Sequence, residues 1–147
     1  MTLEAGFAYA AAVMEMLLQS WGGTIRLFPT VPDRWHDASF EDLRAEGAFV
    51  VSAKLRDGEV LFAGIVSEAG GLCRLRNPWA GGAVIVRAPE GDLELRGEVV
   101  EWETVAGAEY LVFAQGREPD AEDLTPTLPA RTDSDRHWFG VKRLPRF

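Results

Sequence analysis

The side chains best suited to chemistry in this sequence fall into a few small groups. Glu101 and Glu103 flank Trp102 on one predicted strand, and a spacing of two places both carboxylates on the same face. Such a pair is a candidate for binding Ca²⁺ or for catalysis, although a solvated strand face is the simpler interpretation. His36 and Asp37 are adjacent on a predicted loop, where a local turn explains them better than a His–carboxylate couple.

Tryptophan is the second candidate group, because the face of its ring suits the apolar face of a sugar. Trp79, in a glycine-rich loop, and Trp35 are the best candidates for a carbohydrate platform. The alternative is that tryptophans fill the core or an interface of a small domain. The sequence contains five of them, namely Trp21, Trp35, Trp79, Trp102 and Trp138.

The sequence offers no metal-binding or redox motif. Cys73 is the only cysteine, which excludes a disulfide framework, and we expect it to be a small buried side chain. His36 and His137 lie about a hundred positions apart and lack the spacing of metal ligands. We therefore expect neither a metal nor another cofactor.

Composition indicates a globular protein with one real core. The chain has 147 residues, of which 47% are hydrophobic and 26% charged, and its net charge is −8. This charge argues against binding nucleic acid, and basic residues gather only near the C-terminus, where we expect them to pair with the acidic body. No stretch is long enough to span a membrane, and the N-terminus lacks the features of a signal peptide, so the predicted location is cytoplasmic.

Most of the chain is predicted to be β structure. Residues 48–56 alternate between apolar and polar, which is typical of a half-buried strand, and the Asp57-Gly58 turn predicts a hairpin with residues 59–67. Residues 34–45 are interpreted as a covering segment, and residues 93–103 as one strand or two. The predicted fold is mainly β, an antiparallel sandwich of about seven or eight strands preceded by one long N-terminal helix.

That helix is predicted over residues 3–20 and is apolar around most of its circumference. Its polar residues, Glu4, Glu15, Gln19 and Ser20, form one narrow stripe, and Gly22-Gly23 separates it from a strand at 24–28. A mostly β chain of this size can hardly cover such a helix. We therefore expect it to lie among other helices, or against a second copy of itself.

Three regions follow from these patterns. Residues 1–21 are the apolar helix and residues 22–115 are the β-sandwich. Residues 116–147 are rich in proline and acidic residues and end in an apolar stretch at 137–142, which is predicted to be a surface excursion followed by a terminal strand.

An ordered run of residues spans the end of the helix and the strand that follows it: Met14–Ser20, Gly22-Gly23, Ile25, Leu27, Pro29, Val31-Pro32 and Trp35. The pattern continues to the hairpin at Asp57-Gly58 and fades near residues 70–79. It resembles the end of the catalytic barrel in glycoside hydrolase family 95, whose α-fucosidase-like enzymes have an (α/α)6 barrel followed by a C-terminal β-sandwich. The resemblance implies that this chain is the last barrel helix with that sandwich attached.

The resemblance also offers one catalytic residue. In the family, an Asp followed by Gly-Asn-Phe-Gly lies just before this helix, and that Asp falls on Glu4 while its Asn falls on Gly6. The partner acid would belong to the upstream barrel, and glycoside hydrolysis uses two carboxyls. We therefore expect an inverting, α-fucosidase-like parent enzyme and an inactive isolated chain, in which Glu4 interacts with the helix dipole.

Three functions are consistent with these observations. The first is a non-catalytic accessory sandwich that supports a helical catalytic domain. The second is a carbohydrate-binding module that uses exposed tryptophans such as Trp79 and Trp35. The third is a stand-alone interaction protein that forms a homo-oligomer through the helix. The expected partners are accordingly a helical domain, a second copy or carbohydrate, and neither nucleic acid nor membrane.

Overall fold

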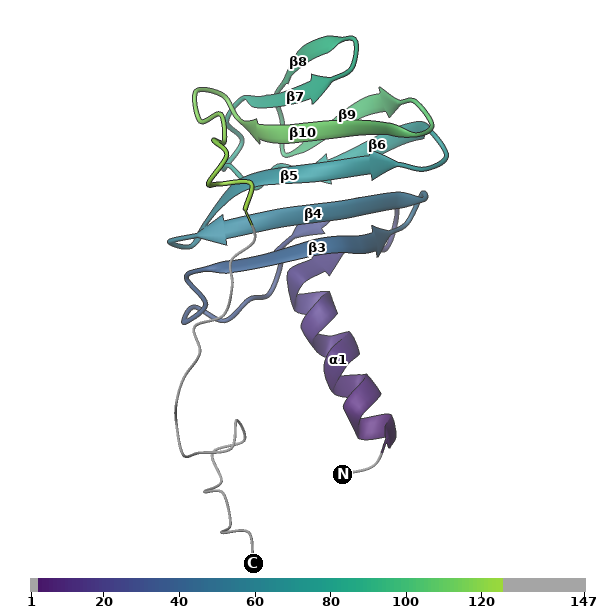
Figure 1. The fold of residues 1–147 in the computed structure, drawn as a ribbon, viewed down its shortest axis with the longest axis vertical. Helices are drawn as coiled ribbons and strands as arrows, with labels where there is room; N and C mark the ends of the chain where they lie inside the picture. The colour runs from purple at the N-terminus through teal and green to yellow at the C-terminus, as the bar shows by residue number, and fades with distance from the viewer. Residues whose placement is uncertain (1–2, 126–147) are drawn as a thin grey trace, which may run out of the picture.

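The fold is seen in a computed structural model, which describes residues 3–125. It is mainly β, as predicted, with one N-terminal helix (Figure 1). Within residues 3–125, eight strands have five residues or more, in agreement with the seven or eight expected, and two further strands have only two residues. The elements are α1 (Leu3–Leu17), β1 (Leu18–Gln19), β2 (Arg26–Leu27), β3 (Ala38–Ala45), β4 (Phe49–Arg56), β5 (Glu59–Ser67), β6 (Gly71–Arg76), β7 (Val84–Ala88), β8 (Gly91–Leu95), β9 (Val99–Thr104) and β10 (Ala108–Ala114).

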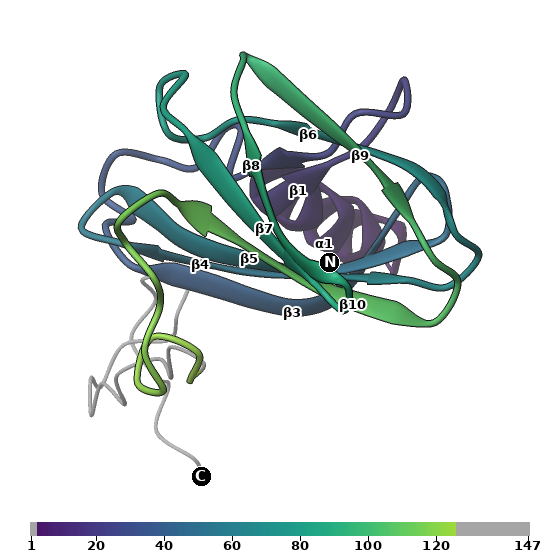
Figure 2. The same cartoon turned by 90° about the horizontal axis from the view of Figure 1, so that it is seen from above.

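The strands form two layers. The larger layer is a six-stranded sheet in the order β3-β4-β5-β10-β7-β8, in which every neighbouring pair is antiparallel. The smaller layer contains the β6-β9 pair, joined to the β1-β2 segment by a parallel bridge between Ile25 and Leu75. Figure 2 shows β6 and β9 lying over the large sheet, so the predicted antiparallel sandwich is confirmed.

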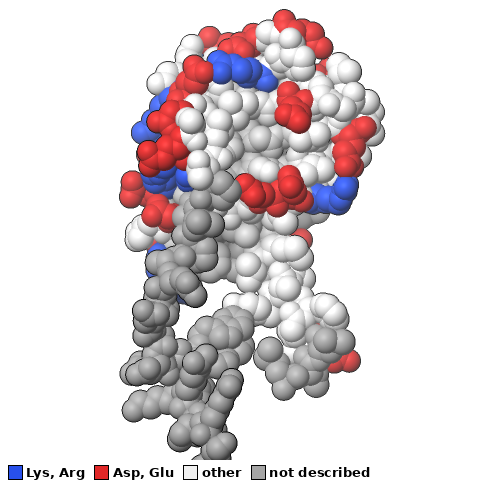
Figure 3. All heavy atoms as spheres, in the orientation of Figure 1, with Lys and Arg blue, Asp and Glu red and all other residues white. Residues whose placement is uncertain are grey.

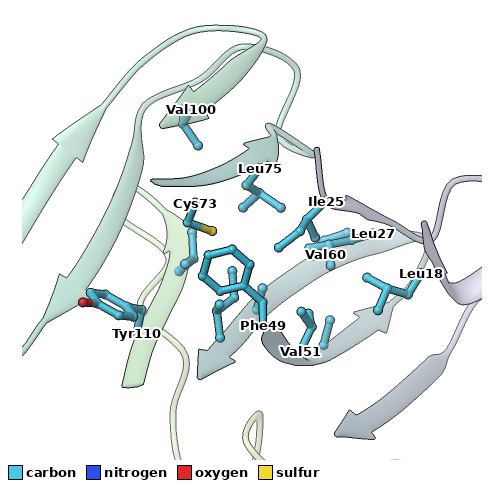
Figure 4. Packing of buried hydrophobic residues seen from close by; sticks show 14 of the residues in the cluster. Leu18, Ile25, Leu27, Phe49, Val51, Val60, Cys73, Leu75, Val100 and Tyr110 are labelled. Carbon is cyan, nitrogen blue, oxygen red and sulfur yellow. The ribbon is translucent and has the colours of Figure 1, made fainter. Parts of the chain in front are cut away.

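The core lies between the two layers and comes from side chains that alternate along the strands. Phe49 and Val51 of β4 point inward, as the alternating pattern predicts, and meet Leu75 of β6 (Figure 4). Cys73 is fully buried beside them, as expected of a small core residue. This burial raises the pKa of the Cys73 thiol to about 12.

The hairpin between β4 and β5 forms at the predicted place. Asp57 and Gly58 have φ values of 50° and 78°, so both turn residues occupy the left-handed region that a two-residue turn requires. β5 begins at Glu59 and ends at Ser67, which are the predicted bounds.

The structure corrects one strand prediction, for residues 34–45, and decides between the two alternatives left open for residues 93–103. Residues 34–45 are not only a covering segment, because β3 forms the edge of the large sheet. A bulge between Phe40 and Leu43, with Asp42 at φ 56°, breaks the alternation that would have revealed this strand. Residues 93–103 form two strands, and these lie in different sheets, with β8 beside β7 and β9 beside β6.

The helix is shorter than predicted. It ends at Leu17 and not at Ser20, because Leu18 pairs with Leu27 as the chain passes directly into β1. Gly22 and Gly23, at φ 74° and 71°, then form the turn that brings β2 back. Among the described residues, no helix has the length and apolar character needed to cross a membrane.

The first part of the C-terminal region folds back on the outer face of the large sheet. The ammonium of Lys54 donates to the backbone carbonyls of Glu122 at 3.3 Å and Thr125 at 2.7 Å, which buries a lysine expected on a solvated face. Leu124 in this segment is exposed, and the contacts of Lys54 and the ion pair between Arg56 and Asp123 are polar. The predicted strand at 137–142 and the basic cluster lie outside the described residues.

Candidate functional site

Helix α1 projects from the sandwich (Figure 1). From Glu4 to Met16, none of its side chains is buried. Figure 3 shows a largely uncharged surface over this projecting part. Four large apolar side chains stand out on α1 and the turn after β1, with exposed fractions of 66% for Phe7, 57% for Tyr9, 47% for Met14 and 62% for Trp21. An uncovered apolar surface of this kind is a candidate interaction surface.

The C-terminal end of α1 is attached firmly to the sandwich. The Phe28 amide donates to the Leu17 carbonyl at 2.7 Å, and the Glu46 amide donates to the Ser20 hydroxyl at 3.0 Å. The side chain of Glu46 makes a further bond, in which its Oε2 accepts from the Gly23 amide at 2.8 Å. These bonds fix how the helix leaves the sandwich.

Glu4 lies in the first turn of α1, and its side chain is exposed. The other acid of the helix, Glu15, is eleven residues further on, which corresponds to about 16 Å along the axis. An inverting glycosidase separates its two carboxyls by about 6.5–9.5 Å. The two acids of α1 therefore do not form a hydrolytic pair.

The two pairs proposed from the sequence, Glu101 with Glu103 and His36 with Asp37, each include a residue whose contacts have a structural role. Glu101 and Glu103 lie on the exposed face of β9, and Glu101 pairs with Arg74 at 2.7 Å. The carboxylate of Asp37 accepts from the Asp57 amide at 3.0 Å, and the His36 carbonyl accepts from the Gly58 amide at 2.8 Å. Among residues 3–125, no cluster of three or more His, Cys, Asp or Glu side chains is arranged to hold a metal ion.

Trp79 is held by the sandwich and packs against its core. Its indole Nε1 donates to the Val60 carbonyl at 2.7 Å, and its backbone amide donates to Asn77 Oδ1 at 2.9 Å. Asn77 uses its own amide to donate to the carbonyls of Gly82 and Gly97, both at 2.9 Å, so it closes the loop around the ring. The polar edge of Trp79 is thus already occupied.

Trp35 is half-buried and lines a pocket of about 620 Å³ at the same end of the sandwich. The pocket lies between the 28–35 loop, the Asp57-Gly58 turn and the end of β6. The structure therefore brings the two candidate tryptophans to one end of the molecule. Trp79 lines a neighbouring pocket of about 460 Å³, and the two pockets share Gly58, Val60 and Pro78.

Three charged residues of the Trp35 pocket were not singled out by the sequence: Arg26, Asp33 and Arg76. Arg26 and Arg76 come from separate strands, so no local motif joins them. Asp33 follows Pro32 at a turn and lies two residues before Trp35. This closeness to Trp35 was the only feature of the sequence that could have indicated Asp33 as a pocket residue.

Comparison with known proteins places this architecture in a family. Residues 19–112 match the family described as "Glycoside hydrolase family 95, C-terminal domain", a range that begins in β1 and ends in β10. A relative, alpha-L-fucosidase 2 from Arabidopsis thaliana, is 40% identical over 67 residues. The match covers 45% of this chain and 8% of that protein, so the chain corresponds to a small part of its relative's length. The resemblance found in the sequence is confirmed, and the chain belongs to glycoside hydrolase family 95 through its C-terminal domain.

Proposed function

We propose that this chain is a non-catalytic accessory domain of a glycoside hydrolase, and that it docks through α1 against the helices of a catalytic domain. The observation that carries the proposal is the uncovered apolar surface of α1. Fully burying a side chain such as Phe7 or Met14 is worth about 1.5–3 kcal/mol. Several such side chains on one helix would contribute together to an interface and help to offset the cost of association.

The catalytic role is assigned to the partner and not to this chain. Hydrolysis of a glycoside requires an acid and a base on opposite sides of the scissile bond. Glu4 has no second carboxylate of α1 within that range, and an acid in the first turn of a helix is stabilised by the helix dipole. The relative's name points to α-L-fucosides as the substrates of the whole enzyme.

The direct test is binding between this chain and the separately expressed helical domain of a family 95 enzyme, measured by calorimetry. Phe7→Glu should weaken binding at least about tenfold, because it places a charge in the apolar interface. Ala8→Glu is the matched control, since it adds the same charge on the stripe shared with Glu4 and Glu15 and should bind normally. Equal behaviour of the two variants would contradict docking through the apolar face.

Two further measurements separate this proposal from its alternatives. The isolated chain should not hydrolyse an aryl α-L-fucoside, and turnover that is lost in Glu4→Gln would contradict the accessory role. Light scattering should show a monomer at low concentration. A stable dimer that Phe7→Glu dissociates would instead assign the apolar surface to a second copy of this chain.

A further inference from the structure

We propose that the pocket beside Trp35 binds one neutral sugar residue of an oligosaccharide, which makes this accessory domain a carbohydrate-binding unit as well. The inference goes beyond the docking of α1, and its variants leave α1 unchanged. It starts from the size of the pocket. At about 620 Å³, the pocket falls in the range of about 300–1,000 Å³ that is typical of small-molecule sites.

The pocket is lined by both apolar and polar residues. Its apolar lining comes from the edge of the core and from the prolines of the 28–35 loop, and includes Leu27, Phe28, Leu55, Val60, Pro29 and Pro32. Trp35 adds an aromatic ring to this lining. A sugar has the same division, since its ring C–H groups form an apolar face and its hydroxyls lie around the edge. An aromatic side chain beside polar groups matches that division.

The charged groups of the pocket have free hydrogen-bonding capacity. Within the part of the chain that the structure describes, no hydrogen bond or ion pair occupies the carboxylate of Asp33. Arg26 uses Nη1 to donate to the carbonyls of Trp21 at 3.2 Å and Thr24 at 3.0 Å. Its Nε and Nη2 protons remain available, because a guanidinium carries five donors. Asp33 supplies acceptors and Arg26 supplies donors, and a sugar hydroxyl uses both.

The charges of the lining residues bear on the charge of the ligand. Arg76 is paired with Glu98, whose Oε1 lies 3.2 Å from Nη2. Of the other charged lining residues, Arg26 carries +1 and Asp33 carries −1, which sum to zero. A neutral ligand with many hydroxyls therefore fits this pocket better than a phosphate or a uronic acid, which would need a surplus of positive charge.

The loop that carries Trp35 is held by hydrogen bonds within the chain. The Trp35 amide donates to the Pro32 carbonyl at 2.8 Å, and the next two residues are tied to the β4–β5 turn by the bonds of His36 and Asp37. A pre-ordered loop lowers the entropy cost of binding. The indole N–H of Trp79 already donates to Val60, so that edge of Trp79 is not offered to a ligand in the neighbouring pocket.

The test is a titration of the full chain followed by ¹H–¹⁵N NMR of the tryptophan indoles. The probes are methyl α-L-fucoside, methyl β-D-galactoside and methyl β-D-xyloside, with glucuronic acid as the charged comparison. Trp35→Phe identifies the Trp35 signal by its loss. We expect a saturable shift of that signal with at least one neutral glycoside, while the signal of the buried Trp102 stays in place.

Asp33→Asn should weaken this binding about tenfold, because it removes a charge-assisted acceptor. Glu41→Gln is the matched control, since it makes the same change on the exposed side of β3, and it should bind normally. Urea unfolding of each variant shows whether the fold is intact. A Trp35 signal that does not move up to the solubility limit of the glycosides overturns the proposal. So does equal binding by Asp33→Asn, or a response to glucuronic acid alone.

Discussion

The two layers of the sandwich are joined at one end by a buried pair of hydroxyls, and its contribution to stability can be measured. Thr104 Oγ1 donates to the Gly71 carbonyl at 2.6 Å and lies 2.8 Å from Ser67 Oγ. Because the single proton of Thr104 is used for Gly71, the Ser67 hydroxyl must donate to Thr104. Ser67 Oγ in turn accepts from the Gly70 amide at 3.1 Å. This chain of bonds connects β5 of the large sheet to β6 and β9 of the small one.

Thr104→Val keeps the shape of the side chain and removes both of its hydrogen bonds. Two bonds at about 1 kcal/mol each, together with the cost of leaving the Ser67 donor buried and unpaired, predict a loss of roughly 2–4 kcal/mol in the free energy of unfolding. Ser67 is 0% exposed and Thr104 is 7% exposed, so water cannot replace the lost partners. Thr104→Ser keeps the hydroxyl and should cost only about 1 kcal/mol for the missing methyl.

Urea unfolding monitored by tryptophan fluorescence provides the assay. With a typical slope of about 2 kcal/mol per molar urea, Thr104→Val should lower the midpoint by about 1–2 M. In the double variant with Ser67→Ala, the loss should fall short of the sum of the single losses by at least about 1 kcal/mol, because no donor is then stranded. Equal midpoints for Thr104→Val and Thr104→Ser, or strictly additive losses, would refute this reasoning.

Three more predictions follow from buried groups. Trp79→Phe keeps an aromatic ring but loses the bond to Val60, and should destabilise the domain by about 1–2 kcal/mol in urea; an unchanged midpoint would contradict the structural role of the indole. The Cys73 thiol stays protonated in the folded state to about pH 12, whereas the unfolded thiol ionises near 9.0, so stability should fall as the pH rises between these values. This fall should be smaller in Cys73→Ala at matched pH. Lys54→Met should speed amide exchange in residues 117–125, because the carbonyls of Glu122 and Thr125 lose their hydrogen bonds from the Lys54 ammonium. Unchanged exchange would show that other contacts hold the segment.

The parts of the fold that local patterns specify were predictable. The alternation through β4, the turn at Asp57-Gly58 and the return through β5 are properties of adjacent residues, and they appear as expected. The bulge in β3 was not predictable in the same way. It leaves Phe40 and Leu43 on the inner side although they are three residues apart, and a period of two cannot detect that spacing.

The pocket depended on distant contacts and was only partly visible in the sequence. Trp35 was a candidate because of its residue type, but Arg26 and Arg76 meet it only because the Ile25–Leu75 bridge sets the two strands side by side. The burial of Lys54 has a similar origin. It follows from the return of a segment about seventy residues later in the chain, which no pattern around Lys54 indicates.

The position of the apolar helix and the position of the pocket are mechanically related. Leu17 is bonded to Phe28, and Phe28 lines the Trp35 pocket, so the end of the helix and the pocket lining have ten residues between them along the chain and are joined by a 2.7 Å bond. A catalytic domain docked on α1 would therefore hold the pocket at a fixed distance and direction. A sugar residue bound there would in turn be presented at a defined position relative to that domain, which a flexible linker could not achieve. The short, bonded connection between α1 and β2 is thus the element that would couple the proposed docking to the proposed carbohydrate binding.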